Sequence, residues 1–285
     1  MTRFVRGWAL LAACAMAAAA PAPLVLRPDA AIAVDLQPQA LAERGALSAA
    51  AVAGGRLDGR LAPSRGGIVA LNGGNELWIP LRLHNPSNRP QAWQLQLPSP
   101  SIDEASLFEP AGTQWTESSA GDRVSRAQWS RPGRYPSFAL RLEAGETRPV
   151  ILRVRNAVPA PVPALLVGDA SAQASELRAE LGFGVVLGAL ALLVAACLIQ
   201  AVQYRDASYF LYGAYALLLG LAFGAMSGLA GQYVWGHLTD WNDASKSAFP
   251  LAAAGVSVWL VRALCQVPTR ARGLSRATAA VGAAV

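Results

Sequence analysis

The hydrophobic pattern divides the chain into an N-terminal apolar run, a middle region of short alternating segments and a C-terminal region of long apolar segments. In the middle region, apolar and polar side chains alternate along four short runs, which turn residues such as Asn85 and Pro86 separate. The aligned apolar positions are Leu77, Ile79, Leu81 and Leu83; Trp93, Leu95 and Leu97; Phe138, Leu140 and Leu142; and Val150, Leu152 and Val154. Short runs of period two between turns predict an antiparallel β-sandwich or jelly roll. We place this domain at residues 24–168.

Two details refine this domain. Pro80 interrupts the first alternating run, and because proline lacks a backbone N–H we expect an edge strand or a bulge there. Residues 24–65 form a lead-in, in which we expect one strand at 33–36 and a short helix at 40–52. A polar, Ala/Ser-rich connector at 169–180 then leads into the first long apolar segment without an obvious break.

The C-terminal region predicts an α-helical transmembrane bundle. Apolar segments at 181–202, 208–229 and 247–265 are each close to the length of about 20 residues that crosses a hydrocarbon core. A fourth apolar stretch begins at about residue 274 and is too short to cross. We therefore expect the sequence to be a fragment that stops at the start of a fourth helix.

The first 22 residues read as a signal peptide. Arg3 and Arg6 give the positive start, and an Ala-rich apolar run follows. Two alternatives remain for Cys14: a lipidated first residue after a lipobox-like Leu-Ala-Ala-Cys, or a small apolar filler, which we prefer.

The distribution of charge predicts the topology. The third apolar segment is followed by arginines at 262, 270, 272 and 276, whereas the loop at 231–246 holds Asp240, Asp243 and Lys246. Basic residues collect on the inner side of a membrane. We therefore expect a multi-pass protein of the bacterial inner (cytoplasmic) membrane, with its N-terminal domain in the periplasm.

Composition removes several functional classes. Charged residues make up only 15% of the chain, against roughly a quarter in soluble domains, and this deficit counts against a soluble protein. The net charge of +6 comes without a basic and aromatic stripe, so we do not expect a nucleic-acid partner. The cysteines, at positions 14, 197 and 265, all lie outside the predicted sandwich, which therefore has no disulfide framework or thiolate metal site.

Candidate chemistry is that of a binding protein. His84 and His237 lie far apart, and no catalytic or phosphate-binding motif is present, so we expect no enzyme activity, no cofactor and no metal. Aromatic side chains in loops suit sugar stacking, with charged groups at the rim. The candidate ligand-binding residues are Trp115, Trp129 and Tyr135, with Arg131, Arg134 and Asp122. The alternative for aromatic residues is a core position, which we favour for Trp78 and Trp93.

Particular runs of residues resemble a receptor family. In the apolar region these are Gly182, Gly184 and Gly188, the run Tyr204-Arg-Asp-Ala-Ser-Tyr-Phe-Leu-Tyr212 with Tyr215, and Gly228-Leu-Ala-Gly-Gln-Tyr-Val-Trp235 with Trp241; in the sandwich they are Leu77-Trp78, Leu81, Asn85, Gly121-Asp122-Arg123 and residues 138–142. Together they resemble the bacterial seven-transmembrane receptors with diverse intracellular signalling modules (7TMR-DISM), with the type 2 extracellular domain of that family. The likeness covers about residues 33–267.

The resemblance implies a fold and a role. The exported domain would be a jelly roll similar to carbohydrate-binding modules, and seven helices would precede a cytoplasmic output such as a diguanylate cyclase or histidine kinase, which this chain lacks. The expected partners are the lipid bilayer, a small-molecule or carbohydrate ligand, a cytoplasmic signalling domain or partner, and, as an open alternative, a second copy of the chain. The competing hypothesis is a non-signalling, membrane-anchored binding protein of the cell envelope.

Overall fold

The computed structural model describes residues 23–26, 32–33, 40–54, 68–69, 75–266 and 278–282. The predicted signal peptide, the question of Cys14 lipidation and the arginines at 270, 272 and 276 lie outside these residues. So does most of the predicted fourth helix, of which residues 278–282 are helical.

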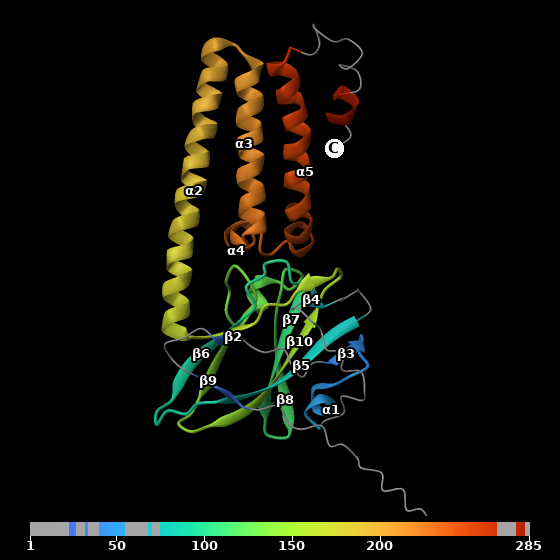
Figure 1. The fold of residues 1–285 in the computed structure, drawn as a ribbon, viewed down its shortest axis with the longest axis vertical. Coiled ribbons are helices and arrows are strands. Elements are labelled where there is room, and N and C mark those ends of the chain that lie inside the picture. Colours follow the sequence, from blue (N-terminus) through green and yellow to red (C-terminus); the bar gives the residue numbers. More distant parts are fainter. Residues whose placement is uncertain are drawn as a thin grey trace, which may run out of the picture.

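The N-terminal half is a β-sandwich, as the alternating runs predict (Figure 1). One sheet has the order β1-β5-β10-β7-β8, with β3 also paired to β5; its strands are β1 (Leu24–Val25), β3 (Ala40–Glu43), β5 (Asn75–His84), β7 (Glu104–Ala111), β8 (Gln114–Ala120) and β10 (Thr147–Arg155). The second sheet has the order β2-β12-β6-β9, from β2 (Ile32–Ala33), β6 (Gln91–Gln96), β9 (Ser137–Leu142) and β12 (Leu165–Gly168). A short pair joins β4 (Ile68–Val69) to β11 (Ala160–Pro161).

The core between the two sheets is built from the apolar positions of the alternating runs. Leu77, Ile79 and Leu83 of β5 and Leu152 of β10 are at most 1% exposed, and they face Leu95, Phe138 and Leu140 of the second sheet. Because successive strand side chains point to opposite faces, the residues between them form the outer faces. Trp93 lies in this core, as predicted. Trp78 is also buried, but in a second cluster on the outer face, where it stacks on Phe108 at 5.5 Å beneath α1 (Ala49–Ala53).

Pro80 lies where β5 has a partner on one side only. On one side β5 pairs with β10 along its length, including Pro80 with Ile151. On the other side the described residues place β3 opposite Asn75–Trp78 and β1 opposite Leu83–His84. The proline therefore occupies a local edge, which explains how a residue without an N–H is accommodated in the middle of a long strand. In the lead-in, β3 and α1 occupy the region where a single helix at 40–52 was predicted.

The C-terminal half is helical, with bounds that differ from the hydropathy segments. The helices are α2 (Asp169–Tyr204), α3 (Ala207–Met226), α4 (Leu229–Tyr233) and α5 (Thr239–Leu264). Among the described residues, α2, α3 and α5 are long and apolar enough to cross a membrane. The connector at 169–180 forms the opening turns of α2. The helix of the first span therefore begins directly after β12, the last strand of the sandwich. Residues 239–246, predicted as part of a loop, belong to α5.

The sandwich lies at one end of the helices. Figure 1 shows the sheets below α4 and the N-terminal end of α5, with the turn between α2 and α3 at the opposite end. At that turn Arg205 ends α2, and Asp206 caps α3 by accepting a hydrogen bond from the Ser208 N–H at 2.8 Å. This arrangement places the loops after β6 and β8 directly against the helices.

Candidate functional site

The loop at residues 121–135, between β8 and β9 of the sandwich, contacts the helices. It begins at Gly121, where a side chain would overlap the backbone carbonyl of Asp103. The close approach allows the Asp122 N–H to bind Ile102 O at 2.9 Å and the Arg123 N–H to bind Asp103 O at 3.1 Å. These bonds fix the direction in which the Asp122 and Arg123 side chains leave the sandwich.

Asp122 forms a buried ion pair with Lys246 of α5. The two side chains are 1% and 10% exposed. Lys246 also donates to Pro100 O at 2.7 Å, and the Asn242 side chain donates to Asp122 O at 3.4 Å. Beside this pair, Arg123 binds Asp243 of α5 at 3.0 Å. The first two turns of α5 are therefore bound to the sandwich by charge-assisted contacts, which are stronger than neutral ones.

The electrostatic balance at this contact is unusual. Asp103, Asp122 and Asp243 present carboxylate oxygens that all lie within 4.8 Å of one another. Lys246 and Arg123 bind these oxygens. Burial raises the pKa of Asp122 from its ordinary 3.8 to about 6, although Lys246 acts in the opposite direction. Desolvation therefore outweighs the attraction of the lysine.

Arg126 fills a second contact, against α4 and the turn that follows it. Its N–H binds Gly236 O at 3.4 Å, and its guanidinium lies 4.0 Å from the centre of the Trp129 ring. A side chain at Gly236 would overlap Arg126, and one at Gly231 would overlap Asn242 and lie 3.0 Å from Arg126, so the two glycines provide the space it needs. Burial lowers the pKa of Arg126 to about 10, and the nearby Asp122 charge offsets part of that shift.

The start of α2 is attached to the second sheet by a polar cluster. Asp169, the first residue of the helix, accepts hydrogen bonds from Gln94 at 2.6 Å and Arg131 at 3.1 Å. Gln96 donates to Gln94 at 2.9 Å, and Tyr135 lies 3.4 Å from Gln96. The outer face of β6 is thus covered by the helix and the loop rather than open to solvent.

Replacing Asp169 with alanine is expected to loosen this attachment. The change removes charged hydrogen bonds at a half-buried site, which predicts a loss of about 1 kcal/mol, or about 2–4 °C in melting temperature for a chain of this size. Thermal unfolding of the full chain in nanodiscs measures it. Glu143→Ala is the control, because the Arg141–Glu143 pair is long at 3.8 Å and exposed, so its loss should change nothing measurable.

The six predicted ligand residues do not form one face. Asp122 and Arg131 form ion pairs with Lys246 and Asp169 of the helices, and the Arg134 guanidinium lies over the Phe183 ring of α2. Trp129 and Tyr135 lie in the same loop as these residues. Trp129 is 5% exposed and donates to Val124 O at 3.0 Å. Trp115 lies apart on β8, half-buried against the cluster beneath α1. Of the three aromatic candidates, Trp115 is therefore the one placed away from the helix contact.

The two histidines remain separate, as the sequence indicated. His84 shares a hydrogen bond with Thr147 at 2.9 Å on the outer part of the sheet, and His237 is exposed between α4 and α5. Among the described residues, neither histidine contacts Asp122 or Lys246.

Sequence reasoning missed Arg126, Asn242 and the role of Lys246. Lys246 is the only lysine in the chain, which has 23 arginines. That exception was a readable signal, since lysine is a compact point charge suited to a tight site. No comparable signal distinguishes Arg126 or Asn242.

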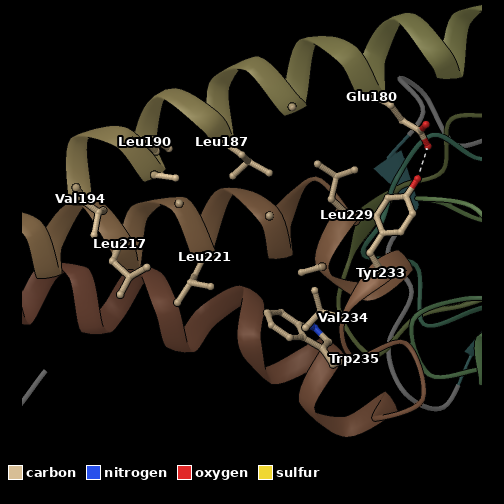
Figure 2. Close-up of a pocket in the computed structure, with 16 residues that line it drawn as sticks. Glu180, Leu187, Leu190, Val194, Leu217, Leu221, Leu229, Tyr233, Val234 and Trp235 are labelled. Atoms are coloured by element: carbon tan, nitrogen blue, oxygen red, sulfur yellow. Dashed lines mark hydrogen bonds between the residues drawn. The ribbon is translucent and has the colours of Figure 1, made fainter. Parts of the chain in front are cut away.

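A groove of about 640 Å³ runs between α2 and α3 and ends at α4 (Figure 2). Its lining is almost entirely apolar, including Leu187, Leu190 and Leu221. At the sandwich end the Tyr233 hydroxyl donates to Glu180 at 2.9 Å, as Figure 2 shows. Such a surface suits contact with lipid chains or with apolar helices.

Comparison with protein families gives two matches. The model "7TMR-DISM extracellular 2" matches residues 43–167, and the model "7TM diverse intracellular signalling" matches residues 179–285. A comparison with curated proteins finds no match.

Two solved structures show a distant likeness to part of the chain. A variant of the Bacillus thuringiensis Cry1Da tryptic core is 10% identical, with a TM-score of 0.21; the match covers 37% of this chain and 21% of that one. A carbohydrate-binding module from Cellvibrio mixtus lichenase 5A, solved with cellotriose, is also 10% identical, with a TM-score of 0.20 and coverage of 37% and 89%. Likenesses this weak carry no argument about ligand.

Proposed function

Because the chain belongs to the 7TMR-DISM family of membrane receptors, we propose that it senses a ligand outside the membrane and passes the signal to a cytoplasmic output. In this proposal the sandwich lies in the periplasm and the helices lie in the inner membrane. The ligand is a small molecule or a carbohydrate. The output is of the diguanylate cyclase or histidine kinase type and lies on a further part of the receptor or on a partner.

The observation that carries this proposal is the double attachment of the sandwich to the helices. Asp169 fixes the sandwich to the start of α2, and Asp122 fixes it to α5 through Lys246. A change in the angle between the two sheets or in the loop at 121–135 would therefore move α5 relative to α2. A ligand shifts such an equilibrium only by its difference in affinity for the two arrangements.

The alternative is a membrane-anchored binding protein that does not signal. It needs a ligand site on the sandwich but no coupling to the helices. An anchor requires no more than one spanning helix and no contact between the sandwich and a later helix. The charged contacts on α5 therefore favour the receptor.

A ligand screen is the first arm of the test, because both functions require a ligand site on the sandwich. The full chain in nanodiscs is tested against glycans and small metabolites by thermal shift, and Trp115→Ala is expected to weaken binding of a sugar ligand at least tenfold, because one stacking ring is lost. Trp129→Ala is unsuitable as the test variant, since loss of a buried ring costs about 3–5 kcal/mol in folding.

The second arm is cellular. Adding the identified ligand to cells that carry the whole receptor should change cyclic diguanylate or phosphotransfer in wild type. The double variant Asp122→Asn/Lys246→Met, which removes the charged link without leaving a buried charge, should reduce that change. Binding without any change of output supports the anchor, and an absence of binding contradicts the sensor role of the sandwich.

A further inference from the structure

We propose that the contact between the sandwich and α5 responds to protons: Asp122 takes up a proton in the docked arrangement, so acidification outside the membrane tightens the docking. This inference rests on the proposed receptor function for its biological meaning. Its physical basis, the docking of the two halves of one chain, is independent of any ligand or output.

The geometry places one carboxylate in a position that water cannot reach. The Asp122 side chain is 1% exposed and lies between the sandwich loop and α5. One oxygen, Oδ2, binds Lys246. The other, Oδ1, is fully buried and has no hydrogen-bond partner among the residues that the structure describes. An ionised carboxylate needs partners on both oxygens, and one unpaired oxygen is a large cost when it is buried.

The charges around Asp122 act in both directions on the free-energy cost of its ionised form. From the sandwich side Asp103, Arg123 and Arg126 face it, and from α5 Asp243 and Lys246 face it. The two neighbouring carboxylates repel the charge of Asp122, and the three basic groups attract it. Arg123 is already bound to Asp243 and Asp103, so Lys246 is the direct partner of Asp122.

The direction of the response follows from the two states of this carboxylate. In the docked arrangement burial raises its pKa to about 6. When α5 separates from the sandwich, the carboxylate regains water and its pKa returns toward the ordinary value. The docked state therefore binds more protons between these two values, so docking strengthens as the pH falls through about 6 and weakens as it rises.

This direction is opposite to what a simple ion pair predicts. If the attraction between Asp122 and Lys246 dominated, acid would neutralise the aspartate and release α5. Because burial is the larger effect, protonation removes a costly buried charge, while Lys246 keeps its bond to Pro100 O.

The distance between two spin labels, measured by electron paramagnetic resonance on the full chain in nanodiscs, tests the proposal. Spin labels are placed at Thr113→Cys and His237→Cys, with the native cysteines replaced by alanine. The second label replaces His237, which is exposed between α4 and α5. An Asn242→Ala background weakens docking without changing an ionisable group, so that both arrangements are populated. From about pH 7.5 to about pH 5 the ratio of docked to separated chains should rise about tenfold.

Two variants identify the responsible group. Asp122→Asn, which mimics the protonated side chain, should show the docked ratio of the acid state throughout the range. Asp243→Asn is the matched control: it removes a neighbouring carboxylate and should keep the transition, with a slightly lower midpoint. A ratio that falls on acidification, stays flat, or still changes in Asp122→Asn overturns the proposal.

Infrared spectroscopy gives an answer even if every chain remains docked. The carbonyl band of a protonated carboxyl should appear with a midpoint near the raised pKa and be missing in Asp122→Asn. If that band appears only near the ordinary pKa of aspartate, the proposal fails. Neither measurement uses ligand or output, so this failure would leave the receptor function to be judged by its own test.

Discussion

Replacing Gly228 with alanine is expected to separate the sandwich from α4 and α5. Gly228 links α3 to α4 with a φ of 81°, a left-handed conformation that costs about 1–2 kcal/mol for a residue with a side chain. The added carbon would also overlap the carbonyl oxygen of Arg134 and lie 3.2 Å from Pro100. Strain and overlap together predict a loss of about 2–4 kcal/mol in docking, or at least about thirtyfold in its equilibrium constant.

The matched control is Gly224→Ala, four residues earlier in α3. A side chain there would lie 3.7 Å from Ala230, which is an ordinary contact, and the helix accepts alanine well. Distance measurements between spin labels should show separation for Gly228→Ala and no change for Gly224→Ala, while circular dichroism shows the same helix content in both. Unchanged docking in Gly228→Ala would mean that the loop at 134 is free to move away from α4.

The sheets could be predicted because a strand exposes its pattern directly. Leu77, Ile79, Leu81 and Leu83 occupy every second position of their run, and each of them is buried between the sheets. The pattern of such a run depends on the two faces of its own strand, so no distant partner needs to be known. The membrane helices could be predicted for a similar reason, since lipid demands a long apolar segment.

The interface could not be predicted, because it depends on which surfaces meet. The polar residues of the first turns of α5 read as a loop by hydropathy, yet they are helical and their side chains bind the sandwich. Trp129 and Tyr135 read as exposed loop aromatics. Instead, Trp129 packs in the sandwich core with the Arg126 guanidinium over its ring, and Tyr135 is half-buried beside Gln96. The Gly121-Asp122-Arg123 run is part of the family resemblance, but Lys246, the partner of Asp122, lies 124 residues further along the chain.

Replacing Lys246 with methionine is expected to be the most damaging change at the ion pair. It leaves Asp122 buried close to Asp103 and Asp243 without its cation, and removal of one partner of a buried pair costs about 3–5 kcal/mol. Chemical unfolding of the full chain at neutral pH measures the loss. The same measurement at about pH 5 should show a smaller loss, because Asp122 is then largely protonated.

The double variant Asp122→Asn/Lys246→Met should recover most of that loss, since no buried charge is left at the pair. The two single variants should also be unequal. In Asp122→Asn the lysine keeps its bond to Pro100 O, whereas in Lys246→Met the aspartate loses the cation that binds it among the described residues. Equal losses in the two single variants would mean that attraction within the pair, rather than burial of the aspartate, determines the energy of this contact. The pair is then a clamp that acid would open, and the predicted response to protons would have the wrong sign.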